Sequence, residues 1–327
     1  MKNRLPKKGP LIIASLLAFN ASANESLPMP TIYGKFDLSV AVEMADEAAF
    51  AIEDAAGDSN YIGINGSIIL DDGKKINYVH EEIMTVTSGL SFGGSYQTYL
   101  GYEQGNGEYR VGNLDLPLKK VMDKADLFSG TYADLSSVVL PNTTADSAVM
   151  YLSETSDLKY ALSLDVGQNT GENANNEDAT KYLRMGAMVD MKLGDSVQLA
   201  AGLENSEFST DFGLAADFIV GEDLVLNLSA SMSDRDESTP LTFTAGGYMR
   251  IGDDSRIKAQ VGMQDPDTDA DNAMLIALGY DKRISSNLTA YGLIALGDKG
   301  GISTTSLEQD ASDAANQVLA VGVNLTF

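Results

Sequence analysis

The strongest constraint on the fold is the alternation of residue types in the last eleven residues, 317–327. In an extended chain, one face of this segment would carry large apolar side chains after Gln317, and the other would carry small or polar ones after Val318. The apolar positions are Leu319, Val321, Val323, Leu325 and Phe327. The length suits a membrane-spanning β-strand, and an aromatic residue suits the end of its apolar face. The segment is therefore predicted to be a two-faced β-strand.

The same alternation recurs along the whole chain. Matching segments occur at 32–42, 61–70, 158–166, 181–193, 197–203, 212–220, 224–232, 242–251, 256–263, 273–282 and 287–294. Shorter or less regular strands are expected at 74–83, 95–103, 108–112 and 148–153. With the last segment, the sequence predicts an all-β chain of about sixteen strands. Lipid-facing and lumen-facing residues alternate in a transmembrane barrel, so the average hydropathy of each strand stays low.

The connections between these segments alternate in length. Short, turn-rich links such as 71–73, 194–196 and 221–222 alternate with longer polar links. The longer links are 43–59, 114–146, 167–180, 204–211, 233–241, 264–272 and 295–316. Short turns at one end and long loops at the other are typical of an outer-membrane barrel. A soluble all-β fold is the alternative, but such a fold does not require short and long links to alternate so regularly.

The N-terminus has the features of a secretory signal. Lys2, Arg4, Lys7 and Lys8 precede a short apolar run at 11–19, and Ala21-Ser-Ala23 forms a cleavage site. The run is too short to span a bilayer as a helix. We therefore expect a signal peptide at 1–23 and a mature domain at 24–327. The chain has no cysteine, so export brings no disulfide framework.

The charge balance excludes several classes of partner. The chain carries 22 basic and 47 acidic residues, a net charge of −25. Cleavage would remove four basic residues and no acidic ones, leaving about −29. A chain this acidic is not expected to bind nucleic acid through its overall charge. It is expected to attract cations.

Several motifs together are similar to a known family. They are the stretches 100–102, 107–117 and 123–128, and the terminal Phe327. On these residues the chain resembles the Gram-negative general diffusion porins over nearly all of 24–327. The resemblance implies a sixteen-stranded, usually trimeric barrel in the outer membrane, surrounded by lipid and lipopolysaccharide. It also implies that the third extracellular loop, after the fifth strand, folds inward, and that Phe327 is a signal for the barrel-assembly machinery.

The link 114–146 is the candidate constriction loop. It mixes apolar residues such as Leu127 and Phe128 with charged ones, whereas a freely solvated loop needs few apolar side chains. Loops of this length are usually functional or disordered. The charged residues expected to line the constriction are Asp115, Lys119, Asp123, Asp126 and Asp134.

The chain departs from the family where basic residues usually line the barrel wall. Tyr61, Asn65, Tyr96, Asn113 and Met150 stand at positions where Arg or Lys is common in the family. The basic wall residues that remain are Lys35, Lys75 and Arg110. A pore with many carboxylates and few arginines favours cations over anions. We therefore expect a cation-selective channel for small hydrophilic solutes, unless most of the acids lie on outer loops.

Other functions have less support. The single histidine, His80, and the lack of cysteine argue against a zinc site or a His-dependent triad. The acidic stretch 265–272 lacks the Gly and Glu that a calcium-binding EF-hand requires. No catalytic residue, cofactor or metal is expected. The open alternatives are a substrate-specific porin, for which the clustered Tyr96, Tyr99 and Tyr102 would suit an oligosaccharide, and a barrel-anchored enzyme or adhesin.

Overall fold

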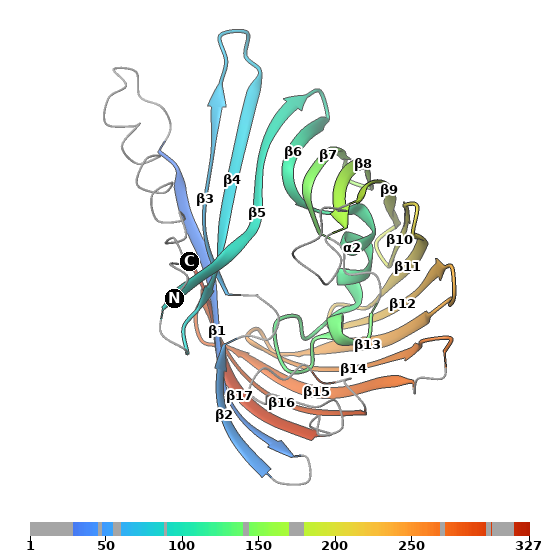
Figure 1. Ribbon diagram of the computed structural model, residues 1–327. Helices are drawn as coiled ribbons and strands as arrows, with labels where there is room; N and C mark the ends of the chain where they lie inside the picture. Colours follow the sequence, from blue (N-terminus) through green and yellow to red (C-terminus); the bar gives the residue numbers. More distant parts are fainter. Residues whose placement is uncertain are drawn as a thin grey trace, which may run out of the picture.

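The protein is a β-barrel in the computed structural model (Figure 1). The structure describes residues 29–44, 48–54, 60–87, 90–139, 144–169, 180–268, 272–298, 302 and 317–327. The expected signal peptide, 1–23, and much of the links 43–59, 167–180 and 295–316 lie outside the described residues. None of the helices in the described ranges has the length and apolar character needed to cross a membrane.

All the strands belong to one antiparallel sheet. They are β1 (Thr31–Met44), β2 (Ala48–Asp54), β3 (Tyr61–Ile69), β4 (Lys75–Thr85), β5 (Ser91–Gln104), β6 (Gly107–Asp115), β7 (Thr144–Glu154), β8 (Leu158–Asn169), β9 (Thr180–Leu193), β10 (Val197–Asn205), β11 (Ser209–Val220), β12 (Leu224–Arg235), β13 (Leu241–Ile251), β14 (Ser255–Asp265), β15 (Ala273–Arg283), β16 (Leu288–Asp298) and β17 (Gln317–Thr326). Each strand pairs with its neighbour in the sequence, except at one place.

That exception explains the strand count. The second half of β1 pairs with β2, from Leu38 opposite Asp54 to Met44 opposite Ala48. The first half of β1 pairs with β3, from Thr31 opposite Asn65 to Lys35 opposite Tyr61. Thus β2 and β3 are two segments of one interrupted strand, and the barrel has the predicted sixteen strands. The expectation of a wholly polar link at 43–59 was wrong, because β2 lies within it.

The barrel closes through the last strand. β17 pairs with β1 along ten register positions, including Leu325 opposite Phe36. Beyond the strand, Phe327 and Gly34 exchange two backbone hydrogen bonds of 3.1 and 3.2 Å. The Phe327 ring stacks on Phe36 with 5.5 Å between centroids. The terminal aromatic residue therefore closes the seam of the barrel as well as ending the apolar face of β17.

The two faces of the sheet differ as the alternation predicts. The outer face exposes large apolar side chains such as Leu214, Val261 and Leu278. The inner face carries small or polar residues, such as Gly213, Gly262 and Gly279, at the alternate positions. Short links join the strands at one end, and glycines in the left-handed region, for example Gly194 and Gly221, occupy these turns.

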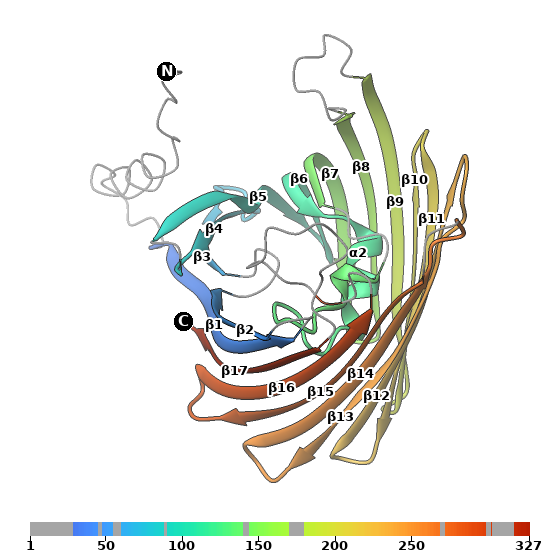
Figure 2. The same cartoon turned by 60° about the horizontal axis from the view of Figure 1, so that its bottom comes forward.

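The segment after β6 packs against the inner face of the sheet. It contains α2 (Pro117–Met122), η1 (Asp123–Ala125) and η2 (Leu135–Ser137). Residues 114–139 will be called the internal segment, and Figure 2 shows α2 inside the ring of strands. Pro117 begins the helix without needing an N–H partner, and no described side chain caps it.

Glycines of successive strands make room for the internal segment. The Cα of Gly202 (β10) faces Leu118 and Val121 so closely that an added Cβ would lie 2.9 and 3.1 Å from their side chains. Further pairs are Gly186 with Pro117, Gly213 with Met122, Gly246 with Leu127, Gly262 with Leu135 and Gly279 with Phe128. The apolar residues predicted in the loop are therefore buried against a glycine-lined wall.

Enlarging one of these glycines should displace the helix. In the variant Gly202→Leu, the new side chain would overlap Leu118 and Val121, and overpacking of this kind costs about 1–3 kcal/mol. We expect a lower melting temperature and faster tryptic cleavage at Lys119, Lys120 and Lys124. The matched control is Gly292→Leu, since a Cβ there meets no atom closer than 3.8 Å. Equal protease resistance of the two variants would contradict the packing described here.

Candidate functional site

Three tyrosines form a continuous aromatic surface on the inner face of β1, β3 and β5. Tyr33 contacts Tyr61 edge to face, with 6.1 Å between ring centroids, and Tyr61 stacks on Tyr96 at 5.4 Å. All three side chains are partly exposed. The set Tyr33, Tyr61 and Tyr96 will be called the tyrosine wall. Two of these residues, Tyr61 and Tyr96, were predicted from their positions in the sequence.

An irregularity in the pairing of β4 and β5 determines where Tyr96 lies. Thr98 is opposite His80 and Ser95 is opposite Glu82, so two residues of β5 face the single residue Glu81. This is the geometry of a β-bulge, which redirects side chains. It brings Tyr96 onto Tyr61. Tyr96, Tyr99 and Tyr102 were considered together as a cluster that would suit an oligosaccharide. Tyr99 lies on the inner face with Arg110, whereas Tyr102 follows the outer-face register of Leu100.

A buried carboxylate lies behind the tyrosine wall. Glu81 faces Tyr33 across Gly63, and the hydroxyl of Tyr33 donates a hydrogen bond of 2.6 Å to Glu81 Oε1. Glu81 is only 8% exposed. Within the described part of the chain, its Oε2 atom has no hydrogen-bond partner. Sequence reasoning missed both Tyr33 and Glu81, although their inward phase in β1 and β4 could have identified them.

The charged edge of the internal segment begins beside this wall. The Nε2 atom of Gln97, next to Tyr96, donates a hydrogen bond of 2.8 Å to Asp115 Oδ2. The Nζ atom of Lys119 lies 2.6 Å from Asp123 and 3.8 Å from Asp115. Burial opposes the charge of Lys119, but the two carboxylates outweigh it and raise its pKa. The structure thus brings together three predicted residues, Asp115, Lys119 and Asp123.

Two of the remaining basic residues are neutralised by carboxylates. Lys75 Nζ lies 2.8 Å from Glu103. Arg110 lies 2.7 Å from Glu108, and its guanidinium sits 4.7 Å from the centroid of the Tyr99 ring. Lys35 lies opposite Tyr61 in the register, on the inner face. The inner face of β1–β6 therefore carries basic residues, but most of those described have a counter-charge.

The structure places three of the predicted wall residues, Asn65, Met150 and Asn113, in different environments. Asn65 is half-buried on the inner face, opposite Val79. Met150 is also on the inner face but is fully buried, so it has no surface with which to line a pore. Asn113 pairs with Thr98 on the outer face, where the regular alternation of β6 also places Tyr109 and Val111. The expectation that Met150 and Asn113 line the constriction was wrong for these reasons.

Asp126 and Asp134 hold the internal segment together. Asp126 accepts hydrogen bonds from the backbone N–H groups of Phe128 and Leu135, at 2.9 and 3.2 Å. Asp134 accepts from Gly130 and Ser136, at 2.6 and 2.7 Å. Both carboxylates were predicted to line the constriction, but their oxygens accept hydrogen bonds from backbone N–H groups of the internal segment. Burial, together with the charge of Asp134, raises the pKa of Asp126 to about 8.

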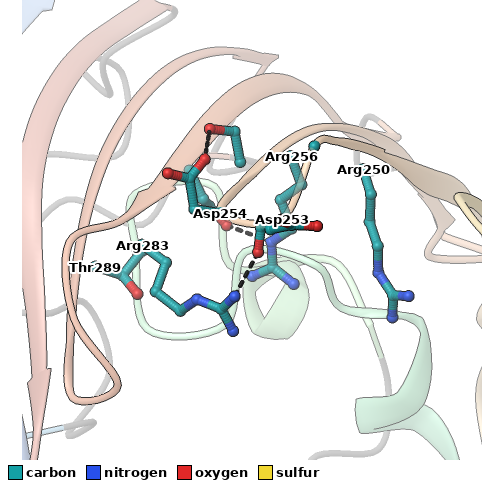
Figure 3. A pocket seen from close by; sticks show the side chains of 9 residues that line it. Arg250, Asp253, Asp254, Arg256, Arg283 and Thr289 are labelled. Carbon is teal, nitrogen blue, oxygen red and sulfur yellow. Dashed lines mark hydrogen bonds and ion pairs between the residues drawn. The ribbon is translucent and has the colours of Figure 1, made fainter.

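The short-link end of the barrel carries an arginine cluster that was not predicted from the sequence. Arg250, Arg256 and Arg283 line a hollow of about 300 Å³, and Figure 3 shows their guanidinium groups around it. Arg256 pairs with Asp281 at 2.6 Å. Arg250 donates to the carbonyl of Glu222 and Arg283 to that of Asp253. The three arginines occupy inward-facing positions of β13–β15, and this phase in the sequence could have identified them as interior residues. Asp253 and Asp254 line the same hollow, so it contains both signs of charge.

A polar group interrupts the apolar outer face. His80 Nε2 lies 3.1 Å from Glu82 Oε1, and its Nδ1 lies 2.7 Å from the hydroxyl of Thr98. The register places these residues with Ile62 and Ile64, on the outer face of β3 and β4. Ionisable residues facing lipid are energetically unfavourable, so such groups usually contact other protein.

The acidic stretch at 265–272 forms its own turn. Asp265 Oδ1 accepts the N–H of Asp267 at 3.0 Å, and Asp267 Oδ2 accepts that of Thr239 at 2.7 Å. Residues 269–271 lie outside the described residues. The carboxylates that the structure describes here are thus bonded to loop backbone.

The fold and the family agree on the class of protein. A family model described as Gram-negative porin matches residues 11–301. Among solved structures, the chain is similar to an anion-selective porin from Comamonas acidovorans, with a TM-score of 0.72 and 18% identity over 91% of this chain and 99% of that one. It is also similar to OmpT of Vibrio cholerae in a trimer form, with a TM-score of 0.64 and 15% identity over 91% and 99%. Comparison with curated protein sequences gave no match.

A closed barrel with an apolar exterior and a polar interior defines a channel-forming protein of the outer membrane. The chain belongs to the Gram-negative porin family, and it is a multi-pass β-barrel of that membrane.

The Asp126 carboxyl should make the internal segment sensitive to pH. Its raised pKa means that protonation favours the folded segment. This contribution is complete below the ordinary pKa of Asp, about 3.9, and is lost as pH rises through about 8. We expect amide exchange of residues 126–136, corrected for the intrinsic effect of pH, to accelerate between about pH 4 and 8 and to change little above that. The variant Asp126→Asn should show little such dependence. An identical pH slope in both proteins would rule out Asp126 as its source.

Proposed function

We propose that this porin is a cation-selective channel for the passive diffusion of small hydrophilic solutes and ions, with no catalytic activity. The observation that carries the proposal is the tyrosine wall, where uncharged rings stand at wall positions that could hold arginine. The internal segment is proposed to form the constriction opposite this wall. Its lining would include Lys119 and Asp123, with the buried Asp115 beside them, together with Lys35, Asn65 and Arg110.

Electrostatics supports a preference for cations. The Debye length at physiological ionic strength is about 8 Å, so charges on the wall act on an ion in a narrow pore. Lys75 and Arg110 each lie close to a carboxylate, at distances of 2.8 and 2.7 Å. Glu81 has no described cation in such contact, and the chain as a whole is strongly acidic. Anions therefore meet few uncompensated positive charges along this side.

Two observations bear on the opposite preference. The Comamonas porin is described as anion-selective, but at 18% identity the likeness concerns the fold alone. The arginine cluster lies at the short-link end, at the termini of β13–β15, and it shares its hollow with Asp253, Asp254 and Asp281. We propose that the constriction, and not this end, determines selectivity.

The biogenesis of the protein follows from the same class. We propose that 1–23 is a signal peptide for Sec-type export and that 24–327 is the mature domain. Phe327 is proposed to be recognised by the barrel-assembly machinery before it closes the seam. Outer-membrane lipid and lipopolysaccharide are the proposed surroundings of the outer face, where large apolar side chains are exposed.

Replacing a wall tyrosine with arginine should move the selectivity toward anions. A unit charge about 4 Å from an ion changes its energy by about 1 kcal/mol in a water-like medium. For Tyr61→Arg we therefore expect a several-fold fall in the permeability ratio of K⁺ to Cl⁻. The measurement is the reversal potential of the refolded protein in a planar bilayer under a KCl gradient. The matched control is Tyr61→Gln, which removes the ring without adding charge. An unchanged ratio in Tyr61→Arg would count against the proposed lining.

We also propose that the protein is a homotrimer in which the outer-face polar group of β4 and β5 contacts a neighbouring copy. The carboxylate of Glu82, 3.1 Å from His80 Nε2, is unfavourable against lipid and is better accommodated against protein. The trimer form of OmpT of Vibrio cholerae, an outer-membrane protein of similar structure, is consistent with this assembly.

Reversing the charge of Glu82 should weaken the trimer. Glu82→Lys would place two basic side chains next to each other at His80, in the interface between copies. We expect a shift from trimer to monomer in sedimentation velocity in mild detergent. The outer-face control Ile276→Ala lies far along the sheet in β15 and should leave the trimer unchanged. A Glu82→Lys protein that remains fully trimeric would exclude this patch as the contact.

A further inference from the structure

We propose that the tyrosine wall, backed by Glu81 and Asp115, is a binding subsite for small organic ammonium ions inside the channel. The inference rests on the proposed channel function and adds to it a class of preferred solute. The ring faces of tyrosine attract cations through their quadrupole, most strongly where water is partly excluded. Weakly hydrated ions such as quaternary ammonium are suited to such a surface.

The barrel already uses this chemistry with its own side chains. Arg110 lies 4.7 Å from the ring centroid of Tyr99, and Lys258 lies 4.3 Å from that of Phe128. Arg256 lies over Tyr248 at 5.7 Å. Among the described cation–ring contacts, none involves Tyr33, Tyr61 or Tyr96. All three residues are partly exposed, so a cation from solution can reach them.

Two buried carboxylates strengthen the attraction. Glu81 and Asp115 are 8% and 7% exposed, so more than nine-tenths of each is buried. The hydroxyl of Tyr33 donates a hydrogen bond of 2.6 Å to Glu81 Oε1, and this bond to a carboxylate increases the electron density of the Tyr33 ring. Glu81 Oε2 and Asp115 Oδ1 have no hydrogen-bond partner among the described residues. Negative charge behind an aromatic surface favours a cation in front of it.

Three lysines near the tyrosine wall influence how strongly it can bind an ammonium ion. Lys119 is held between Asp115 and Asp123, at 3.8 and 2.6 Å. None of the described ion pairs includes Lys120, and burial lowers its pKa against the opposing charge of Asp115. Lys35 faces the same wall in the register of β1 and β3. Lys120 and Lys35 therefore oppose the bound ion, and removing the charge of Lys120 should strengthen binding.

The chemistry favours an organic cation over a metal ion. In the residues that the structure describes, no group of three or more acidic or histidine side chains is arranged to hold a metal. A metal ion would need several oxygen ligands at short range. The wall offers ring faces instead, with carboxylates behind them.

The test uses the full refolded protein in a planar bilayer, with tetraethylammonium chloride added to a KCl bath. We expect concentration-dependent block of the K⁺ current. Removal of one cation–ring interaction should weaken block by roughly 2- to 30-fold, the range of such interactions. We therefore expect weaker block of this size in Tyr61→Leu and Tyr96→Leu, and a similar effect in Glu81→Gln. Block should persist in Tyr61→Phe and Tyr96→Phe and become tighter in Lys120→Gln. Tyr109→Leu, on the outer face, is the matched aromatic control.

The outcomes separate the subsite from the channel. Conductance without block by tetraethylammonium would overturn the subsite and leave the channel in place. The subsite would also be overturned if tetraethylammonium blocked Tyr61→Leu as strongly as it blocks Tyr61→Phe and the wild-type protein. Block by maltose as strong as that by the ammonium ion would assign the wall to sugar stacking instead. A refolded barrel with no conductance at all would overturn the channel itself and the subsite with it.

Discussion

The pairing of every strand edge is the constraint on which the rest of this structure depends. Hydrocarbon offers no hydrogen-bond partner, so a sheet in the membrane must close on itself. The pairing of β17 with β1 meets this need, and the stacking of Phe327 on Phe36 continues it to the last residue. Closure also determines the two faces, because each strand must then present alternate residues to lipid and to the interior.

The interior is organised by a second interaction, the packing of residues 114–139 against glycines of the opposite wall. Each of β9, β10, β11, β13, β14 and β15 supplies one glycine that contacts the segment. Asp126 and Asp134 bond the backbone of the segment, which leaves Lys119 and Asp123 to form its charged edge. The tyrosine wall lies beside this edge, where Gln97, next to Tyr96, donates a hydrogen bond to Asp115. The chemistry of the site is thus a consequence of where the sheet has room for a loop.

Much of the fold could be predicted from the alternation of residue types. The strands that follow it most regularly, such as β12 and β17, were expected within a few residues of their bounds. β2 was missed because its alternation is short: Phe50 and Ile52 are the two large apolar residues of its outward phase. Asn113 was assigned to the inner face by comparison with the family, although the alternation of β6 places it on the outer face with Tyr109 and Val111.

The site was harder to predict than the strands. Composition indicates that Asp126 and Asp134 are polar, but only the path of the loop shows that backbone N–H groups occupy their oxygens. Tyr96 was selected as a wall residue from its sequence position, and the bulge that places it beside Tyr61 has no obvious sequence signal. Tyr33 and Glu81 lie on inward phases of strands that were predicted, so attention to phase alone would have found them.

The central claim is that the interior, with its tyrosines and neutralised basic residues, favours cations. The most direct measurement is the zero-current potential of the unmodified protein across a bilayer that separates concentrated from dilute KCl. A cation-selective interior predicts a potential whose sign is that of K⁺ diffusion and whose size grows as the salt on both sides is diluted. A potential with the sign of Cl⁻ diffusion would contradict it.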